Sequence, residues 1–495
     1  MTLLSGDACG HLEVTGCRLY LDNWNDRVHG GWVKRREQGT NLNVRGGNRS
    51  VLIEGNTFIK HGNDEALSFF ATLPAGATEV VHGNVRVVGN TFTYLDSGTT
   101  ADGGTETAGA RPMHVNDVLV SFNPGGDVLG RDVRTVWRDV LFAENTLDLE
   151  GPVKSAVSVN VLPGDVCHNV SFERNRIFHK YIDTHQLPGN GVLDGIGENE
   201  NGASPYLYSN TFAFETIKDR SNLAPGTKGA ASGTGTEIKP TPVVYRGNYI
   251  RYTQKTYDQP DRTNLSSRLA YEHSCFAVHG GDIEILGNRI DGTGAVVVRH
   301  SPDDGVYGNP DNPVTLFHCF PCEVTGNYSV RISGNEATGY GLTLSSRPQY
   351  WGYNSVVKGY CVQMENNTFS EGAAMVLYNV KDSDIAVVRN SFTGCSKETF
   401  IQAVYKVELQ SDPSVKLSLF QNKIAPGFGS GSYCDIIAAE VPKGSPVLTP
   451  ISEFCFMLNY LPGYAGMSMP EKNTAAQSHI SDNLFESNPS NVCGS

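Results

Sequence analysis

The segment Val51-Leu-Ile-Glu-Gly-Asn56-Thr-Phe58 is one copy of a phrase that recurs along the whole chain. Apolar side chains stand five and three residues before the Asn and two residues after it. This alternation with a period of two residues is typical of a β-strand that has one buried face and leads into a turn. The phrase therefore predicts a strand before each Asn, and its recurrence predicts a fold built from repeats.

The other copies share the central Asn and the flanking apolar residues. They are centred on Asn90, Asn145, Asn175, Asn248, Asn288, Asn367, Asn390, Asn422 and Asn459, with weaker copies at Asn210, Asn335 and Asn483 and a copy that has Cys17 in the Asn position. The spacing between these fourteen centres is irregular, whereas leucine-rich and WD arrays have tighter periods. A solenoid that adds one parallel rung per turn accommodates loops of variable length around a constant core.

The Asn at the centre of each phrase has two useful properties. It tolerates the left-handed backbone conformation that a tight turn between strands demands, and its amide both donates and accepts hydrogen bonds. We therefore expect the Asn residues of successive rungs to stack into a ladder.

A second strand in each rung is indicated by apolar runs that follow several of the phrases. These runs cover residues 66–70, 156–161, 295–298, 341–344, 373–377 and 436–439. Their β-branched and aromatic content favours strands, and almost no segment has the apolar spacing of an amphipathic helix. The prediction is an all-β solenoid.

These repeats resemble the right-handed parallel β-helix superfamily of pectate lyases, polygalacturonases and bacteriophage tailspikes, over residues about 12 to 485. The resemblance implies a right-handed, single-stranded parallel β-helix of about 14 coils with long inserted loops, in a single domain over residues 1–495. It further implies a carbohydrate-active protein with a groove along one parallel sheet, most like the tailspike depolymerases. The resemblance to the tailspikes also implies a homotrimer and an extracellular or virion-associated location.

Composition and net charge limit the classes of partner that the chain can bind. The chain has 495 residues and a net charge of −13, with no basic stripe for phosphates, which argues against nucleic acid. No apolar run is long enough to span a membrane, and Met1 to Cys9 lacks the features of a signal peptide. The first phrase begins at Leu12, too near the start for a covering element, so we expect a missing N-terminal module or a partner that caps this end.

Hydrolysis of a glycosidic bond usually takes two carboxylates, and on a β-helix these can come from different rungs, roughly 5 Å or 10 Å apart. Asp64 and Glu65 stand directly before the apolar run at 66–70, where β-helix polygalacturonases place a paired acid. An ordinary solvated turn is the alternative for this segment. Glu272 precedes another strand, and Tyr271 and His273 beside it would complete a sugar subsite.

Two further segments carry candidate residues. Arg299, His300, Asp303 and Asp304 open a long loop, in which the two aspartates would act as catalytic acids or bind Ca²⁺, or form a turn. Arg347, Tyr350 and Trp351 follow a second strand, and an exposed Tyr-Trp pair would give sugar rings a surface for packing. Filling of the core is the alternative for those two rings.

The predicted function is a polysaccharide depolymerase, a glycoside hydrolase that acts on a bacterial surface glycan. No metal site and no cofactor are expected for that reaction. The polygalacturonase motifs match only approximately, since no Arg-Ile-Lys is present and Val278-His279-Gly280 lacks the first Gly of Gly-His-Gly. A lyase of the pectate class is the first alternative and would need Ca²⁺, with Arg299 near Asp303 as its base. A non-catalytic fibre or adhesin that binds glycan through Tyr350 and Trp351 is the second.

Overall fold

The structure is a computed structural model. It describes residues 2–7, 10–22, 40–61, 65–70, 79–95, 116–123, 134–150, 153–180, 207–216, 238–252, 256–257, 271–291, 297–298, 315–319, 326–338, 340–345, 356–370, 375–393, 400–406, 413–428, 432–438, 447–448, 451–468 and 477–486. All regular elements in these residues are strands, with no helix among them. The chain divides into two compact units, one of Met1–Phe276 with Gly294–Asp311 and one of Ala277–Thr293 with Asn312–Ser495.

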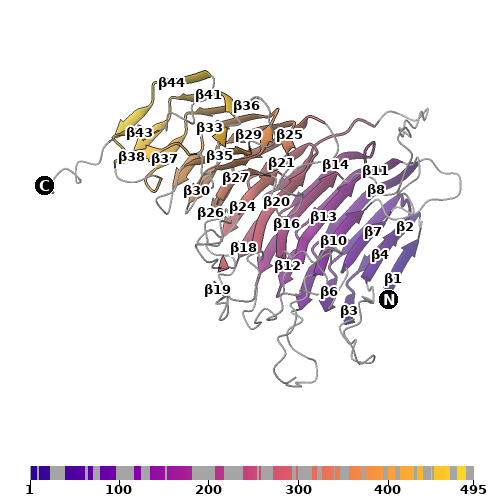
Figure 1. Ribbon diagram of the computed structural model, residues 1–495. Helices are drawn as coiled ribbons and strands as arrows, with labels where there is room; N and C mark the ends of the chain where they lie inside the picture. The colour runs from indigo at the N-terminus through magenta and orange to yellow at the C-terminus, as the bar shows by residue number, and fades with distance from the viewer. Residues whose placement is uncertain are drawn as a thin grey trace, which may run out of the picture. The chain divides into compact units, whose positions relative to one another are not determined.

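Unit 1 contains three parallel sheets, which lie as rows of side-by-side strands in Figure 1. Sheet A consists of β1 (Thr2–Asp7), β4 (Thr40–Arg45), β7 (Leu67–Phe70), β10 (Asn116–Asn123), β13 (Val153–Val161) and β16 (Leu207–Thr216). Sheet B consists of β2 (His11–Thr15), β5 (Ser50–Glu54), β8 (Glu79–Val88), β11 (Arg134–Ala143), β14 (Val166–Glu173) and β17 (Val243–Arg246). Sheet C consists of β3 (Arg18–Asp22), β6 (Thr57–His61), β9 (Thr91–Leu95), β12 (Thr146–Leu149), β15 (Arg176–His179) and β18 (Tyr249–Tyr252).

Unit 2 has the same organisation, and its strands are grouped here as A′, B′ and C′. Sheet A′ consists of β24 (Thr315–Cys319), β27 (Tyr340–Ser345), β31 (Met375–Tyr378), β35 (Ile401–Lys406) and β39 (Ile437–Ala438). Sheet B′ consists of β21 (Ile283–Leu286), β25 (Tyr328–Ser333), β29 (Tyr360–Glu365), β33 (Asp384–Val388), β36 (Val415–Phe420), β41 (Ile451–Met457) and β44 (Gln477–Ser481). Sheet C′ consists of β22 (Arg289–Asp291), β26 (Glu336–Thr338), β30 (Thr368–Ser370), β34 (Ser391–Thr393), β37 (Lys423–Ala425), β42 (Tyr460–Pro462) and β45 (Leu484–Glu486).

The chain visits the three sheets of a unit in a fixed order. In unit 1 each strand of sheet A is followed by one of sheet B and one of sheet C. From β1 to β15 each strand pairs in parallel with the strand three elements further on. This all-parallel, helix-free arrangement is consistent with the predicted β-solenoid. The sequence predicted two strands per repeat, whereas the structure has three, because the residues after each Asn form a strand of sheet C or C′.

The predicted Asn ladder is confirmed, in two stretches. In unit 1, Asn90 Oδ1 accepts hydrogen bonds from the backbone N–H (2.9 Å) and from Nδ2 (3.0 Å) of Asn56. The same pattern continues through Asn145, Asn175 and Asn248, and Cys17 donates its backbone N–H to Asn56 Oδ1 at 2.8 Å. In unit 2 the ladder joins Asn288, Asn335, Asn367, Asn390, Asn422, Asn459 and Asn483.

Two sequence expectations about the Asn positions are wrong. The left-handed residue is the one before each anchor, not the Asn itself, because the backbone must turn before the Asn amide can point into the ladder. These residues are Gly16, Gly55, Gly89, Glu144, Arg174, Gly247, Gly287, Gly334, Asn366, Arg389, Gln421, Leu458 and Asp482. Asn210 is not an anchor, since it lies inside strand β16 and its backbone aligns with Ser155 in β13.

The core of unit 1 is a stack of inward-facing side chains from all three sheets. Phe58 and Phe92 stack with ring centroids 4.6 Å apart on sheet C, and Phe69 and Phe122 stack at 4.8 Å on sheet A. All four rings are at most 1% exposed. Because parallel rungs repeat every 4.8 Å or so, like residues on neighbouring strands reach the spacing of stacked rings.

Candidate functional site

The outer face of sheet A in unit 1 is the candidate site. Phe69 and Phe122 point into the core, where each ring makes an edge contact with Trp137 of sheet B, at centroid distances of 6.4 and 5.8 Å. Successive side chains of a strand point to opposite faces. The residues on either side of these two phenylalanines therefore lie on the outer face.

Two rows of side chains cross the strands on this face. The first row comprises Asn43, Ser68, Ser121, Ser158 and Ala213, all buried. The second row comprises Arg45, Phe70, Asn123, Asn160 and Glu215, of which Arg45 is exposed and the others are intermediate. The second row thus presents a guanidinium, an aromatic ring, two amides and a carboxylate, which a ligand can reach.

Glu65 lies two residues before β7 and joins the first row. Ser121 Oγ donates a hydrogen bond to Glu65 Oε1 at 3.2 Å, and Ser68 Oγ lies 3.1 Å from Ser121 Oγ. The side chain of Glu65 is intermediate in exposure. Because Ser121 is on the outer face, the bond holds the carboxylate of Glu65 on that face, above the strand of the next rung.

The carboxylates described on this face are too far apart to act on one bond. Ser121 holds the Glu65 carboxylate over β10, whereas Glu215 lies on β16, two strand spacings or roughly 10 Å away across the sheet and two residues or roughly 7 Å further along the strands. Glycosidases hold their two carboxyl groups roughly 5 to 9.5 Å apart. A partner for Glu65 in such a reaction would have to come from another residue.

The other residues predicted from the sequence are placed only in part. Tyr271, Glu272 and His273 form the start of strand β20 (Tyr271–His279), and their side chains lie outside the described part of the structure. The remaining eight lie wholly outside the described residues. They are Asp64, Arg299, His300, Asp303, Asp304, Arg347, Tyr350 and Trp351.

Sequence reasoning missed the second row. Its signal is nevertheless present, because Ser121-Phe-Asn123 and Ser158-Val-Asn160 repeat one Ser-x-Asn pattern on adjacent strands. A buried apolar residue between two polar ones marks an outward-facing pair. The pattern was missed because these residues lie outside the phrases that are centred on the Asn anchors.

Two titratable side chains of unit 1 have shifted pKa values, His82 on sheet B and Asp165 directly before β14. The His82 imidazole is 0% exposed and stacks on Trp137 with centroids 4.3 Å apart, and burial lowers the His82 pKa to about 4. Burial raises the pKa of Asp165 to about 6, although its carboxylate accepts backbone hydrogen bonds from Leu162 (2.8 Å) and Thr135 (2.7 Å). Because His82 is enclosed within the core, its titration affects the stability of the fold.

Among the described residues no group of three or more His, Cys, Asp or Glu side chains is arranged to hold a metal ion. No helix long and apolar enough to cross a membrane occurs in the same part of the chain. Comparisons with protein-family models, with curated proteins and with solved structures found no match.

Proposed function

We propose that this chain binds an extended polysaccharide along the outer face of sheet A and hydrolyses it. The single observation that carries the proposal is the second row, which runs across successive strands and offers polar and aromatic groups at each rung. A linear glycan presents hydroxyl groups and apolar ring faces at a similar regular interval. Amides and hydroxyls confer orientation on such a ligand, while an aromatic ring packs on its apolar face.

Glu65 is the acid that we assign to the reaction from the described residues. Its carboxylate is held by Ser121 on the same face as the second row. The second acid would come from Asp64, Glu272, Asp303 or Asp304. In this proposal one carboxyl group protonates the leaving oxygen and the other acts as nucleophile or activates water.

The fold-level part of the proposal is a right-handed parallel β-helix of about 14 coils that forms a single domain, most like the tailspike depolymerases. It carries the further proposals of a homotrimer and of an extracellular or virion-associated location. A mass from light scattering of three chains supports the trimer, whereas a mass near 53.6 kDa means a monomer.

A non-catalytic glycan-binding fibre is the second candidate. It is favoured by the separation of Glu65 and Glu215, since the described face has binding groups without a carboxylate pair. A lyase of the pectate class, with Ca²⁺, remains the third. It would draw its base from Arg299 and its metal ligands from Asp303 and Asp304.

Product analysis distinguishes the three candidates. The protein is incubated with bacterial capsular and lipopolysaccharide glycans, and chain length, new reducing ends and ultraviolet absorbance are followed. A hydrolase shortens the glycan without new absorbance. A lyase adds the absorbance of a double bond and stops when a chelator is added. Tight binding without shortening of the glycan supports the non-catalytic fibre.

The role of Glu65 is tested by Glu65→Gln, which keeps an acceptor for Ser121. We expect the rate on a glycan that the wild type cleaves to fall by 10²-fold or more, because general acid catalysis typically contributes 10²- to 10⁴-fold. Glu54→Gln, at an exposed carboxylate in β5, is the matched control and should leave the rate unchanged. Full activity of Glu65→Gln removes Glu65 from the reaction. Full activity after alanine replaces Asp64, Glu65, Glu272, Asp303 and Asp304 together rejects the whole set.

A further inference from the structure

A compact group of cations and aromatic rings lies on the outer side of sheet C in unit 1. Strands β15 and β18 each carry two outward residues, Arg176 and Phe178 on the first and Tyr249 and Arg251 on the second. Both arginines are exposed, and both rings are intermediate in exposure. We call these four residues the sheet C patch.

Charged and aromatic residues alternate along each strand, and the register also places a charged residue opposite an aromatic one across the two strands. Arg176 aligns with Tyr249, and Phe178 aligns with Arg251. The Arg176 guanidinium carbon lies 5.5 Å from the centre of the Phe178 ring, and the Phe178 and Tyr249 rings meet edge to face at 6.0 Å. Two guanidinium groups therefore flank two rings on adjacent strands, and these strands are about 4.8 Å apart.

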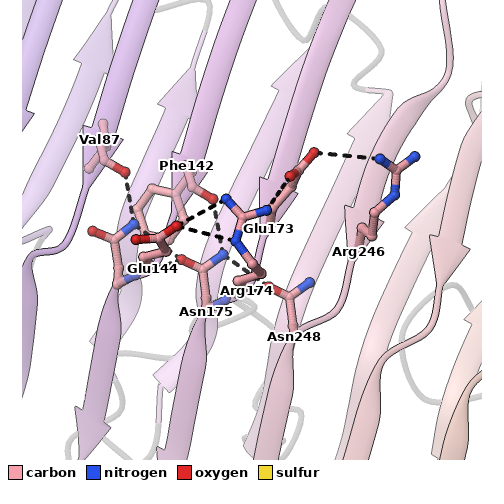
Figure 2. A network of polar contacts seen from close by, with 9 residues as sticks. Val87, Phe142, Glu144, Glu173, Arg174, Asn175, Arg246 and Asn248 are labelled. Atoms are coloured by element: carbon pink, nitrogen blue, oxygen red, sulfur yellow. Dashed lines mark hydrogen bonds and ion pairs between the residues drawn. The ribbon is translucent and has the colours of Figure 1, made fainter.

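The arginines of the patch differ from those at the nearby corner of sheets B and C. Figure 2 shows that Arg174 bonds Glu144 at 3.0 Å and Glu173 at 2.9 Å, and that Arg246 lies 3.9 Å from Glu173. Arg176 and Arg251 have no carboxylate within ion-pair distance anywhere in the described ranges. The corner is thus internally neutralised, while the patch presents two positive charges to solvent.

The backbone beneath the patch is held in place, because the inward residues of its strands are packed in the core. The His179 and Tyr252 rings stack 4.3 Å apart, and Thr211 Oγ1 lies 2.8 Å from both His179 Nε2 and Tyr252 Oη. All three residues are at most 2% exposed. A surface that is held in its binding geometry loses little entropy when a ligand docks.

We propose that the sheet C patch is a second saccharide-binding site, which takes a sugar that carries a carboxylate. The planar guanidinium fork matches a carboxylate and binds it through two parallel hydrogen bonds. The Tyr249 ring, together with the part of the Phe178 ring that Arg176 leaves uncovered, supplies the apolar contact for a sugar ring. This site does not rest on the proposed cleavage at sheet A, because it has its own strands and its own ligand chemistry.

The charges favour an acidic glycan over a nucleic acid. Binding to nucleic acid depends on several cations that replace counterions along the phosphates. The patch has two cations without an ion-pair partner among the described residues, in a chain of net charge −13. A glycan with one carboxylate every second sugar requires fewer cations. The two half-buried rings then contribute specificity beside the charges.

The test is a binding titration with the full chain and hyaluronan fragments, which carry one glucuronate in each disaccharide. Dextran fragments of equal length and a single-stranded oligonucleotide are the comparison ligands. The double variant Arg176→Gln with Arg251→Gln is compared with Arg86→Gln with Lys423→Gln, which removes the same charge from exposed positions on β8 and β37. Unchanged denaturation midpoints show that each variant is folded.

We expect the wild type to bind hyaluronan fragments more tightly than dextran, and the patch variant to lose at least 10-fold in affinity while the control variant loses less than 2-fold. Equal losses in both variants, tighter binding of the oligonucleotide, or no binding of the fragments would overturn the proposal. Phe70→Ala with Asn160→Ala, on sheet A, should leave this affinity unchanged. The failure of the sheet A proposal is thereby distinguished from the failure of this one.

Discussion

The residue before each ladder Asn is a constrained backbone position in every described rung that has such an anchor. It has a positive φ at every anchor, yet only some of these residues are glycines. A left-handed conformation costs a residue with a side chain about 1–2 kcal/mol, which glycine avoids. The ladder hydrogen bonds that the turn permits offset this cost.

Leu458 is the clearest test of that constraint, with φ of 56° and a side chain that is 44% exposed. We expect Leu458→Gly to raise the free energy of unfolding by up to about 1 kcal/mol, measured by urea denaturation. Gly89→Ala, at φ of 66° with no atom near the added Cβ, should lower it by about 1 kcal/mol. Gly10→Ala, which also has open space but no positive φ, is the control and should change little. A destabilised Leu458→Gly contradicts this account.

His82 and Asp165 should give the stability two opposite pH dependences. The folded-state pKa of His82 is lowered to about 4 from an ordinary 6.5, so its contribution to stability falls as the pH drops from about 6.5 to about 4. The pKa of Asp165 is raised to about 6 from 3.8, so its contribution rises as the pH drops from about 6 to about 4.

Urea denaturation at pH 7 and pH 5 separates the two residues. Relative to the wild type, His82→Phe should gain stability at pH 5 over pH 7, because it removes the group that resists protonation. Asp165→Asn should show its larger relative gain at pH 7, where the wild type holds a partly buried carboxylate. The difference between pH 7 and pH 5 should be about 2 kcal/mol for His82→Phe and about 1.4 kcal/mol for Asp165→Asn, at 1.36 kcal/mol per pKa unit. Equal pH dependence in all three proteins would show that neither group is perturbed.

At the scale of the structural element, each ladder Asn connects neighbouring rungs. Asn145 Oδ1 accepts two bonds from Asn90, and its Nδ2 donates to Val87 O at 2.9 Å and to Asn175 Oδ1 at 3.1 Å. Its side chain is 0% exposed. Removing this amide leaves several buried groups without partners.

We therefore expect Asn145→Ala to lower the free energy of unfolding by about 3 kcal/mol or more, since each unsatisfied buried group costs about 1–3 kcal/mol. Asn483→Ala removes a partly buried anchor of unit 2 and should cost about 1 kcal/mol, because water can replace part of the lost bonding. Chemical denaturation monitored by circular dichroism provides both values. If Asn483→Ala cost as much as Asn145→Ala, burial would not explain the strength of the ladder.

The sequence predicted the elements well where one rule governs them. Alternation around the Asn fixed the strand positions of sheet B, and the dual hydrogen-bonding capacity of the amide predicted the ladder. The prediction of a ladder anchor was wrong at Asn210. A similar local pattern there forms a strand of sheet A, because the segment pairs with β13. The third strand of each repeat was missed because it has only three to five residues in many rungs.

At the scale of the whole molecule, the candidate site was less predictable than the fold. The sequence pointed to Glu65, which lies before a strand, but not to Asn123 or Asn160, whose proximity depends on the register of β10 and β13. The sheet C patch likewise arises only when β15 and β18 align. The register between distant segments is set by the complete stack of rungs, so it cannot be read from any single phrase.

The central claim is that the outer face of sheet A recognises a glycan. The most direct measurement is the binding of the full chain to an array of bacterial capsular and lipopolysaccharide oligosaccharides, with Phe70→Ala and Asn160→Ala combined and with Arg86→Gln as the control. We predict that the wild type and the control bind the same glycans and that the double variant binds them at least 10-fold more weakly. Equal binding by all three proteins, or no glycan bound by the wild type, would contradict the claim.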